Sequence, residues 1–350
     1  MTGLASQGGP MSGSGVRRAR SWRAARRQRF FTWSGIALVL LLAVGVHSLM
    51  WGAVQFGPAE AVRGLRPGGD PIVRTVVWEI RFPRFIDGML VGASLAVAGS
   101  LLQVVVRNPL ADPTILGVSA AAGLGTSIML VLVPGAAVAA LVGVGMTGGI
   151  VGALIILLIA WQGAVSALRL TLAGVALSAF FGAVIIGLLA SSRTFLEVSL
   201  GFLAGGLYGV DWRHATAAAP VAFPAILLAA ALSGRLNALA LGDDLAAGLG
   251  VLADRTRFFA LTLAGALAGV AVAIAGLVSF VGLVSPHLAR FAVGDDHRYL
   301  VPTSAITGAL LVTSADLIAR LVIRPAELPM GIITAAVGAP FLLYLLRFRS

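Results

Sequence analysis

The sequence contains no cysteine, which excludes disulfide bonds, thiol chemistry and thiolate metal sites. It also contains no lysine, because all 25 basic residues are arginine. The GxxxxGKS or GxxxxGKT loop that holds the phosphates of ATP requires a lysine, so the chain is not a P-loop ATPase. GxSxG and HExxH motifs are absent as well. We therefore expect a protein that is not an enzyme and that holds no metal ion or other cofactor.

Charged residues are scarce, at 11% of the chain, whereas a soluble domain has about 25%. Hydrophobic residues make up 59% of the sequence and the mean hydropathy is +0.99. The apolar runs are long and recur throughout, which favours membrane-spanning helices over a barrel of alternating strands. Helices also pair the backbone polar groups that lipid leaves without water. The composition thus predicts an all-α, polytopic membrane protein.

Ten membrane spans can be placed, since a span needs about 20 apolar residues. Within the long uncharged stretch, Pro134-Gly135 marks a turn, and Gly276 marks a second break. We expect residues 31–350 to form a single ten-helix domain with both termini on one side. The expected spans cover about residues 31–56, 85–106, two within 113–168, 170–190, 215–232, two within 258–293, 301–321 and 330–346.

The N-terminal segment carries seven arginines between residues 17 and 29, and the net charge of the chain is +11. We interpret residues 1–30 as a basic, disordered cytoplasmic tail that orients the first span by the positive-inside rule, and not as a nucleic-acid-binding segment. With ten spans, sixteen of the 25 arginines fall on the side of this tail. Both termini and a charged loop at about residues 235–257 are therefore predicted to be cytoplasmic.

A faint internal repeat links the two halves of the chain. A shift of 177 positions spans five crossings, an odd number, so the halves would have opposite topology, as in many transporters. The shift superposes Gly92, Ala96, Ala98, Gly99, Pro109 and Gly117 on Gly269, Ala273, Ala275, Gly276, Pro286 and Gly294.

The stretch VVVRNPLADPTILG, residues 104–117, interrupts a very apolar region and predicts the cytoplasmic turn between the second and third spans. Arg107 suits the carbonyl end of a helix. Asn108 comes next, and Pro109 and Pro113 then prevent the second and third spans from forming one overlong helix. Because Pro109 falls opposite Pro286 in the repeat, we expect this break to occur twice in the architecture.

The loop LALGDDLAAGLGVLADRTR, residues 239–257, predicts a short cytoplasmic helix. Gly242 breaks the preceding helix, Asp243 can cap the next one, and Gly250 can end it. Leu245 and Leu249 then share one face of that helix. Two interpretations stay open: a helix that lies on the membrane surface, and an apolar knob that docks into a cytoplasmic partner.

Two further groups of polar residues have structural interpretations. Asp316 and Arg320 are four residues apart near the end of the ninth span, which predicts a neutralised pair on one helix face rather than a proton relay. We treat Asp316 as the only acid inside a span, which argues against proton-coupled transport. Asp295 and Asp296, with two nearby histidines, are interpreted as a capped turn after Gly294, because too few ligands converge for a metal site.

Several segments together resemble one family. They are RFPRFIDGMLVGASLAVAGSLLQVVVRNPLADPTILGVSAAAG, LGDDLAAGLGV, FVGLVSPHLAR, DHRYLVP and ADLIAR followed by ELPMGIITAAVGAPFLLYLL. In this order they resemble the permease subunit of ABC importers for iron-siderophores, haem and cobalamin. The resemblance extends from about Trp51 to Arg347. It implies the type II importer fold of the cobalamin permeases, in the cytoplasmic (inner) membrane of a bacterium.

The resemblance also implies partners and roles. The chain would pair with a second permease copy or a paralogue, two ATPase subunits and an extracytoplasmic substrate-binding protein. Arg81, Arg84 and Arg320 would meet acidic residues of that binding protein. A ferric siderophore is the expected substrate, with haem or cobalamin as alternatives and an ion-coupled secondary transporter as the alternative of another class. The residues that would couple to the ATPase are Leu241, Gly242, Asp243, Asp244, Leu245, Leu249 and Gly250.

Overall fold

The computed structural model describes residues 13–66, 68, 70–162, 164–165, 167–191 and 201–348. A short hairpin of two-residue strands, β1 (Trp161–Gln162) with β2 (Ala164–Val165), lies between two of its helices. In chain order the helices are α1 (Gly13–Met50), α2 (Pro58–Gly64), α3 (Pro71–Arg74), the π-helix η1 (Thr75–Arg81), α4 (Phe82–Val106), α5 (Val118–Leu132), α6 (Val138–Ala160), α7 (Ala167–Ser191), α9 (Trp212–Ala231), α10 (Ser233–Ala240), α11 (Asp243–Gly248), α12 (Ala253–Ala275), α13 (Val281–Val293), α14 (His297–Val322) and α15 (Met330–Phe348).

The predicted all-α membrane fold of about ten helices is confirmed. Eight helices of the described residues are long and apolar enough to cross a membrane, and the shorter apolar helices α5 and α13 complete a set of ten. Pro134-Gly135 separates α5 from α6, and Gly276 ends α12, as the sequence predicts. The first two spans differ from their expected bounds. The first ends at Met50 instead of near residue 56, and the second begins at Pro71 instead of near residue 85, because α3, η1 and α4 are continuous.

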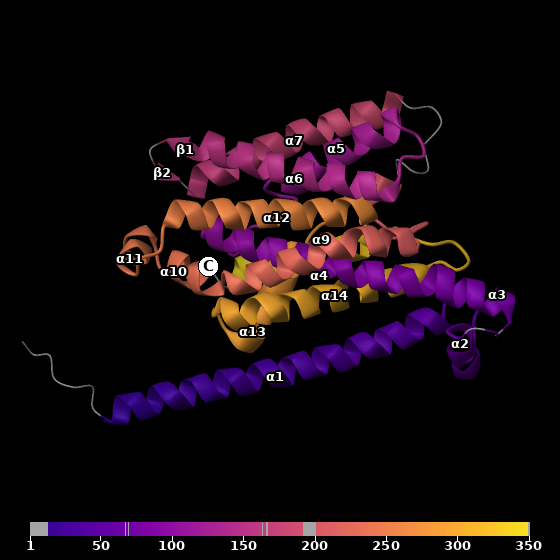
Figure 1. The fold of residues 1–350 in the computed structure, drawn as a ribbon, viewed down its shortest axis with the longest axis horizontal. Helices are drawn as coiled ribbons and strands as arrows, with labels where there is room; N and C mark the ends of the chain where they lie inside the picture. The colour runs from indigo at the N-terminus through magenta and orange to yellow at the C-terminus, as the bar shows by residue number, and fades with distance from the viewer. Residues whose placement is uncertain are drawn as a thin grey trace, which may run out of the picture.

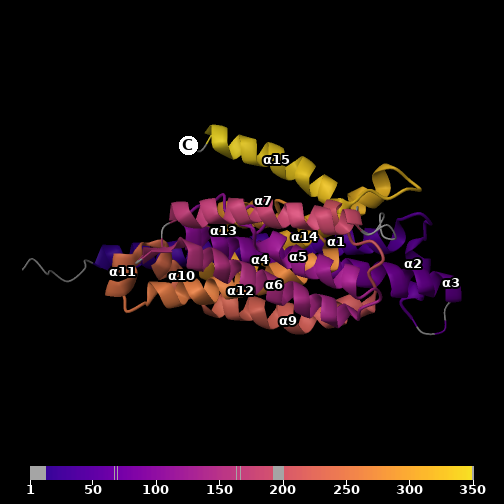
Figure 2. The ribbon, with the colours of Figure 1, turned by 90° about the horizontal axis from the view of Figure 1, so that it is seen from above.

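The long helices run side by side in one bundle. Figure 1 shows α5, α6 and α7 along one side, α1 along the opposite side, and α4, α9, α12 and α14 between them. In Figure 2, α15 stands at the margin of the bundle, and it packs on α13 and α14. Helices α10 and α11 lie at one end, here named the α11 end, where α1 begins and α15 ends. Helices α2 and α3 lie at the opposite end, here named the α2 end.

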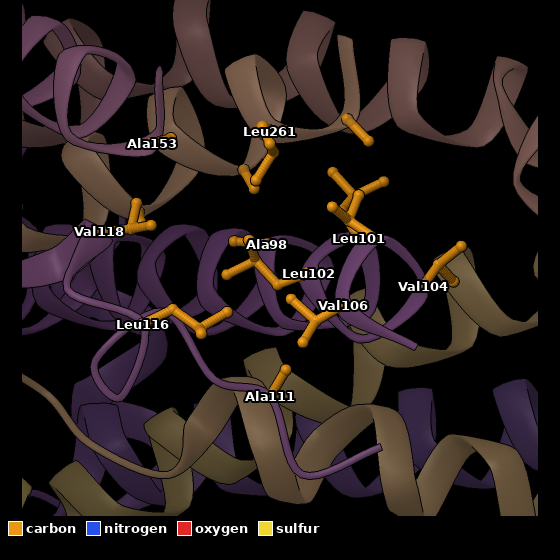
Figure 3. Close-up of a cluster of buried hydrophobic side chains, with 14 of the residues drawn as sticks. Ala98, Leu101, Leu102, Val104, Val106, Ala111, Leu116, Val118, Ala153 and Leu261 are labelled. Atoms are coloured by element: carbon orange, nitrogen blue, oxygen red, sulfur yellow. The ribbon is translucent and has the colours of Figure 1, made fainter. Parts of the chain in front are cut away.

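Helix α4 forms the centre of the core, and most of its residues are buried. Figure 3 shows Ala98, Leu101 and Leu102 of α4 among apolar side chains that include Ala153 of α6 and Leu261 of α12. In lipid, burial of apolar groups gives little driving force, so close packing has to stabilise this centre. The small side chains of α4 allow its neighbours to approach on several sides.

Glycines bring the helix backbones into contact. A Cβ atom on Gly92 of α4 would lie 2.1 Å from the carbonyl oxygen of Gly308 in α14, and one on Gly149 of α6 would lie 2.2 Å from that of Gly265 in α12. The α4–α14 and α12–α6 pairs are the two most extensive helix contacts of the described residues. A repeat that relates α4 to α12 and α14 to α6 would also relate the first pair to the second. The similarity of the two contacts therefore supports an internal repeat.

The ungapped register of that repeat does not extend to the prolines. Pro109 lies in the turn after α4, whereas Pro286 lies inside α13, so the expected second break at Pro286 is wrong. Gly117 precedes α5, while Gly294 follows α13. The connections between the helices therefore differ in length between the halves, and a fixed shift aligns helices but not turns.

The disorder predicted for residues 1–30 is also wrong for residues 13–30, which form the first half of α1. Residues 1–12 lie outside the described part of the chain. At 1.5 Å per residue, the 38 residues of α1 extend for about 57 Å, well beyond a hydrocarbon core of about 30 Å. The arginine-rich half of α1 is therefore a helical continuation of the first span.

Candidate functional site

The loop at the α11 end is a short helix held between two glycines. Gly242, with φ of +114°, precedes α11, and Gly250, with φ of +75°, follows it. Other residues rarely adopt these backbone angles, so glycine is required on both sides of the helix. The predicted short helix and its two ends are confirmed. The predicted cap is wrong, since the N-cap of α11 is Gly242 and no side chain caps it.

Asp243 anchors the loop to the bundle instead of capping it. Its carboxylate accepts a hydrogen bond from Arg257 of α12 at 2.5 Å and forms an ion pair with Arg107 at the end of α4. Partial burial opposes ionisation of Asp243, but the hydrogen bonds and charges of the two arginines outweigh it and hold its pKa below the usual range. The first residue of α11 is thereby tied to two membrane helices.

Leucine side chains of the loop face outward. Leu241, Leu245 and Leu249 are 60%, 60% and 64% exposed, and Leu252, just after the loop helix, is 60% exposed. Asp244 is exposed beside them, while Ala246 is buried against the bundle. A cluster of exposed apolar side chains on an anchored helix is typical of an interaction surface. The arrangement is compatible with both interpretations of this loop, and the docking role stays a prediction.

The turn at residues 107–117 lies next to this loop. Arg107 ends α4 in the left-handed conformation, with φ of +52°. Asn108 Oδ1 accepts the N–H of Leu110 at 2.9 Å, and Asp112 Oδ1 accepts that of Thr114 at 2.8 Å. Burial outweighs these and other hydrogen bonds at Asp112 and raises the pKa of its carboxyl above the usual range. Side chains of the turn therefore satisfy its own backbone, as a tight break between two spans requires.

A cavity of about 690 Å³ opens between this turn, α10, α13 and the end of α15. Pro109 and Leu241 contribute to its wall, while Pro113 packs closely on Gly282 of α13. Arg290 in the same wall donates a hydrogen bond to Gln103 at 3.0 Å. The complete lining is Gln103, Val104, Arg107, Asn108, Pro109, Leu110, Ala240, Leu241, His287, Arg290, Asp295, His297, Leu345 and Leu346.

A second polar cluster is buried at the α2 end and centres on Asp316 of α14. Its carboxylate pairs with Arg84 of α4 at 2.8 Å and with Arg320, one turn further on, at 3.1 Å. Arg84 also pairs with Glu327 at 2.8 Å. The predicted pair of Asp316 and Arg320 is confirmed, and it belongs to a larger network that joins two helices. Buried charges of this kind need such paired, hydrogen-bonded surroundings.

Arg81 and Arg320 bind the last carbonyl groups of α1 and the segment just after it. Arg81 donates hydrogen bonds to the carbonyl oxygens of Leu49, at 2.7 Å, and Val54. Arg320 donates a hydrogen bond to the side-chain Oγ of Ser48 at 3.0 Å. Helix C-termini carry unpaired carbonyl groups and partial negative charge, which arginine satisfies. These two arginines thus fasten α1 to the bundle.

All three arginines that were expected to meet a binding protein are therefore buried within this chain. Arg81, Arg84 and Arg320 are 5%, 9% and 5% exposed. Their direct contact with acidic residues of a partner stays a prediction, and it requires them to exchange the internal groups that they bind here. The sequence spacing could not reveal this, because Arg84 and Asp316 are 232 positions apart.

Asp87 corrects the expectation that Asp316 is the only acid inside a span. It lies in α4, one turn after Arg84 and within the predicted second span, and it is fully buried. Neither of its carboxylate oxygens has a hydrogen-bond partner among the described residues. Its position in the span 85–106 was the signal that could have identified it.

The capped turn predicted around Gly294 is confirmed. Gly294 ends α13, and the Asp296 carboxylate caps α14 by accepting the N–H of Arg298 at 3.1 Å. Asn237 of α10 donates a further hydrogen bond to Asp296 at 2.8 Å. The turn after α13 is thus fixed to the helix that precedes the α11 loop.

Comparison with known proteins assigns this arrangement to a family. The profile of the FecCD transport family matches residues 40–348. The chain belongs to the FecCD transport family. Its sequence is 36% identical to the Fe(3+)-citrate import system permease YfmE of Bacillus subtilis, over 90% of this chain and 94% of that protein. It is 43% identical to the Fe(3+) dicitrate transport system permease FecD of Escherichia coli, over 77% and 85%.

FecCD relatives with another cargo are about as similar. The chain is 36% identical to the vitamin B12 import system permease BtuC of Vibrio cholerae, over 92% of this chain and 95% of that protein. A solved structure described as an inward-facing metal-chelate type ABC transporter matches with a TM-score of 0.78 and 30% identity, over 90% and 98%. The chain is accordingly a permease subunit of an ABC importer for iron-citrate, siderophore or cobalamin, and the ATPase is a separate subunit.

Proposed function

We propose that this chain is the permease through which a ferric siderophore crosses the cytoplasmic membrane, driven by ATP hydrolysis in a partner subunit. The observation that carries the coupling is the anchored α11 loop with its exposed leucines. Among the relatives, the names of YfmE and FecD give iron citrate as cargo, which supports a ferric chelate. Cobalamin is the second candidate, which the similarity to BtuC proteins favours.

We propose that two ATPase subunits bind at the α11 end. Each would receive the leucines of one α11 loop, because the assembly would contain this permease and a second copy or a paralogue. Closure of the ATPase pair on ATP would then move the loops. Since Asp243 ties α11 to Arg107 and Arg257, this motion would pass to α4 and α12 and change which side of the path is open.

The α11 end is proposed to be cytoplasmic. The seven arginines between residues 17 and 29 precede the apolar part of α1 at that end, in keeping with the positive-inside rule. The α2 end would then face the substrate-binding protein. Docking of that protein through Arg81, Arg84 and Arg320 is part of this proposal, with its acidic residues replacing Asp316, Glu327 and the α1 carbonyls as their partners.

Growth and uptake measurements test the cargo. A strain that lacks this gene is supplied with iron as citrate, hydroxamate or catecholate chelates, or as haemin, and in parallel with cobalamin under conditions that require it. We expect restored growth and uptake of radioactive iron from one class of ferric chelate when the gene is returned. Rescue by cobalamin or haemin alone would overturn the siderophore assignment and leave the importer assignment in place.

Co-purification tests the mechanism. The permease, purified with its ATPase and reconstituted in lipid, should hydrolyse ATP faster when the loaded binding protein is added than when the empty one is added. Uptake that persists with an ATPase unable to hydrolyse ATP would contradict the proposed energy source.

A further inference from the structure

A groove of about 430 Å³ lies between α1 and α13. Figure 1 shows α13 near the α11 end of the bundle. The groove has no part in the coupling loop or in the network around Asp316. Its walls come mostly from α1 and present residues at positions 25, 28, 29, 32, 33 and 36, which follow one helix face. The lining residues are Ala25, Gln28, Arg29, Thr32, Trp33, Ile36 and Ala292.

The chemistry of the groove changes along the helix axis. Gln28 and Arg29 are at its polar end, whereas Trp33 and Ile36, one and two turns further along α1, are at its apolar end. A phospholipid has the same order of groups, an anionic phosphate followed by acyl chains.

Contacts between α1 and α14 fix the walls of the groove. Arg26 forms an ion pair with Asp296 at 3.5 Å, and the rings of Phe30 and Tyr299 are 5.4 Å apart. Trp33 Nε1 approaches the hydroxyl of Thr307 at 3.5 Å. The groove is therefore bordered by side chains that are already held in place, which lowers the entropic cost of binding.

The charge at the polar end is positive. Arg26 is paired with Asp296, but Arg29 forms no ion pair with any residue of the described ranges. The arginines from 17 to 29 add a concentrated positive charge to the same half of α1. Trp33 follows closely, and tryptophan is typical of the level of lipid headgroups. Basic pockets between helices at this level suit anionic headgroups.

We propose that this groove binds an anionic phospholipid, with its phosphate at Arg29 and Gln28 and an acyl chain along Trp33 and Ile36. The placement of that lipid in the inner leaflet rests on the proposed orientation, but binding itself does not. The bound lipid would fill the gap between α1 and α13 and hold the basic half of α1 at the membrane surface.

Fluorescence of Trp33 tests the proposal directly. A chain whose other five tryptophans are replaced by phenylalanine is reconstituted in phosphatidylcholine vesicles that contain increasing mole fractions of either brominated phosphatidylglycerol or brominated phosphatidylcholine. We expect phosphatidylglycerol to quench Trp33 at several-fold lower mole fraction. Because a basic residue near the surface contributes about fivefold in affinity, Arg29→Gln should reduce this preference by about fivefold.

The matched control is Arg169→Gln, an exposed arginine at the start of α7, which lies at the same end on the opposite side of the bundle. It should leave the preference unchanged. Equal quenching by the two brominated lipids, or the same effect of both substitutions, would overturn the proposal.

Native mass spectrometry gives a second measurement that needs no tryptophan substitution. The unaltered chain in detergent, mixed with phosphatidylglycerol and phosphatidylcholine, should retain phosphatidylglycerol, and the Arg29→Gln chain should retain about fivefold less. If Arg29→Gln instead weakens only the association with the ATPase and leaves lipid retention unchanged, the groove belongs to a protein interface and the lipid proposal is wrong. Neither lipid assay depends on transport, so failure of the importer proposal would be seen separately.

Discussion

At the scale of single residues, Asp316 neutralises two buried arginines that belong to different helices. Replacement of one partner of a buried ion pair leaves an uncompensated charge, which costs about 3–5 kcal/mol. Asp316→Ala leaves Arg84 with Glu327 and leaves Arg320 without its carboxylate. We expect it to lower the free energy of unfolding by about 3 kcal/mol or more, measured by denaturant titration of the purified chain in detergent.

Glu327→Gln provides the control within the same network. The Glu327 side chain is 23% exposed and pairs with Arg84, which keeps Asp316 as a second partner. Its replacement should cost clearly less than that of Asp316. An equal loss of stability in the two variants would show that Asp316 is not the centre of the cluster.

Asp243 gives the α11 loop a dependence on pH. Its pKa is lower in the folded chain than the unfolded value of about 3.9, so the ionised group stabilises the anchor above that pH. The contribution is lost as the pH falls through the folded pKa. Because the chain has no cysteine, a single spin label at Leu249→Cys can report mobility of the loop. We expect higher mobility once the pH falls below the folded pKa in a titration from pH 7 into the acid range.

Asp243→Asn supplies the comparison for that titration. With no carboxylate to ionise, the labelled variant should be mobile at pH 7 already and should change little on acidification. A label that stays immobile in Asp243→Asn at pH 7 would mean that Arg107 and Arg257 do not hold the loop through this residue.

At the scale of elements, α6 and α12 touch through glycine, so one methyl group should separate them. A Cβ atom on Gly149 would meet the backbone of Gly265 at 2.2 Å, whereas one on Gly143, in the same helix, meets nothing within 4 Å. We expect Gly149→Ala to lower the melting temperature and Gly143→Ala to leave it unchanged or raise it, because alanine is the better helix former by about 1 kcal/mol. Equal melting temperatures of the two variants would contradict this packing.

The membrane helices could be predicted from the sequence because each one is a long apolar run, which the bilayer itself requires. The first half of α1 could not be predicted as a helix, because its arginines leave no apolar periodicity to detect. Its alanine, arginine and glutamine residues favour a helix, but propensity alone is a weak signal. Its contacts, such as Arg26 with Asp296, join residues far apart in the sequence.

The same reason limits prediction of the two sites. The α11 loop could be found because glycines, acids and leucines lie together within residues 239–257. Its anchor at Arg107 could not, since that residue belongs to another turn. The burial of Arg84 and Arg320 equally depends on packing of α4 against α14, which no local pattern contains.

At the scale of the whole molecule, α4 connects the two polar sites. Arg84 lies near its start in the Asp316 cluster, and Arg107 at its end holds Asp243 of the α11 loop. The two arginines are about 35 Å apart along a straight helix. A buried helix that is fixed at both ends can carry a displacement at one end to the other as a rigid element. If the partners dock as proposed, this geometry would let ATPase motion at the α11 end reach the α2 end.

The exposed leucines of the α11 loop should therefore decide coupling without affecting the fold. A central apolar contact of an interface contributes about 2 kcal/mol, which corresponds to about thirtyfold in affinity. We expect Leu245→Arg to weaken binding of the ATPase by about that factor and to abolish ATP-driven uptake in proteoliposomes, with an unchanged melting temperature. Leu168→Arg, the same change at an exposed position near the start of α7, is the matched control and should transport normally. Normal uptake by Leu245→Arg would show that the ATPase docks elsewhere on the α11 end.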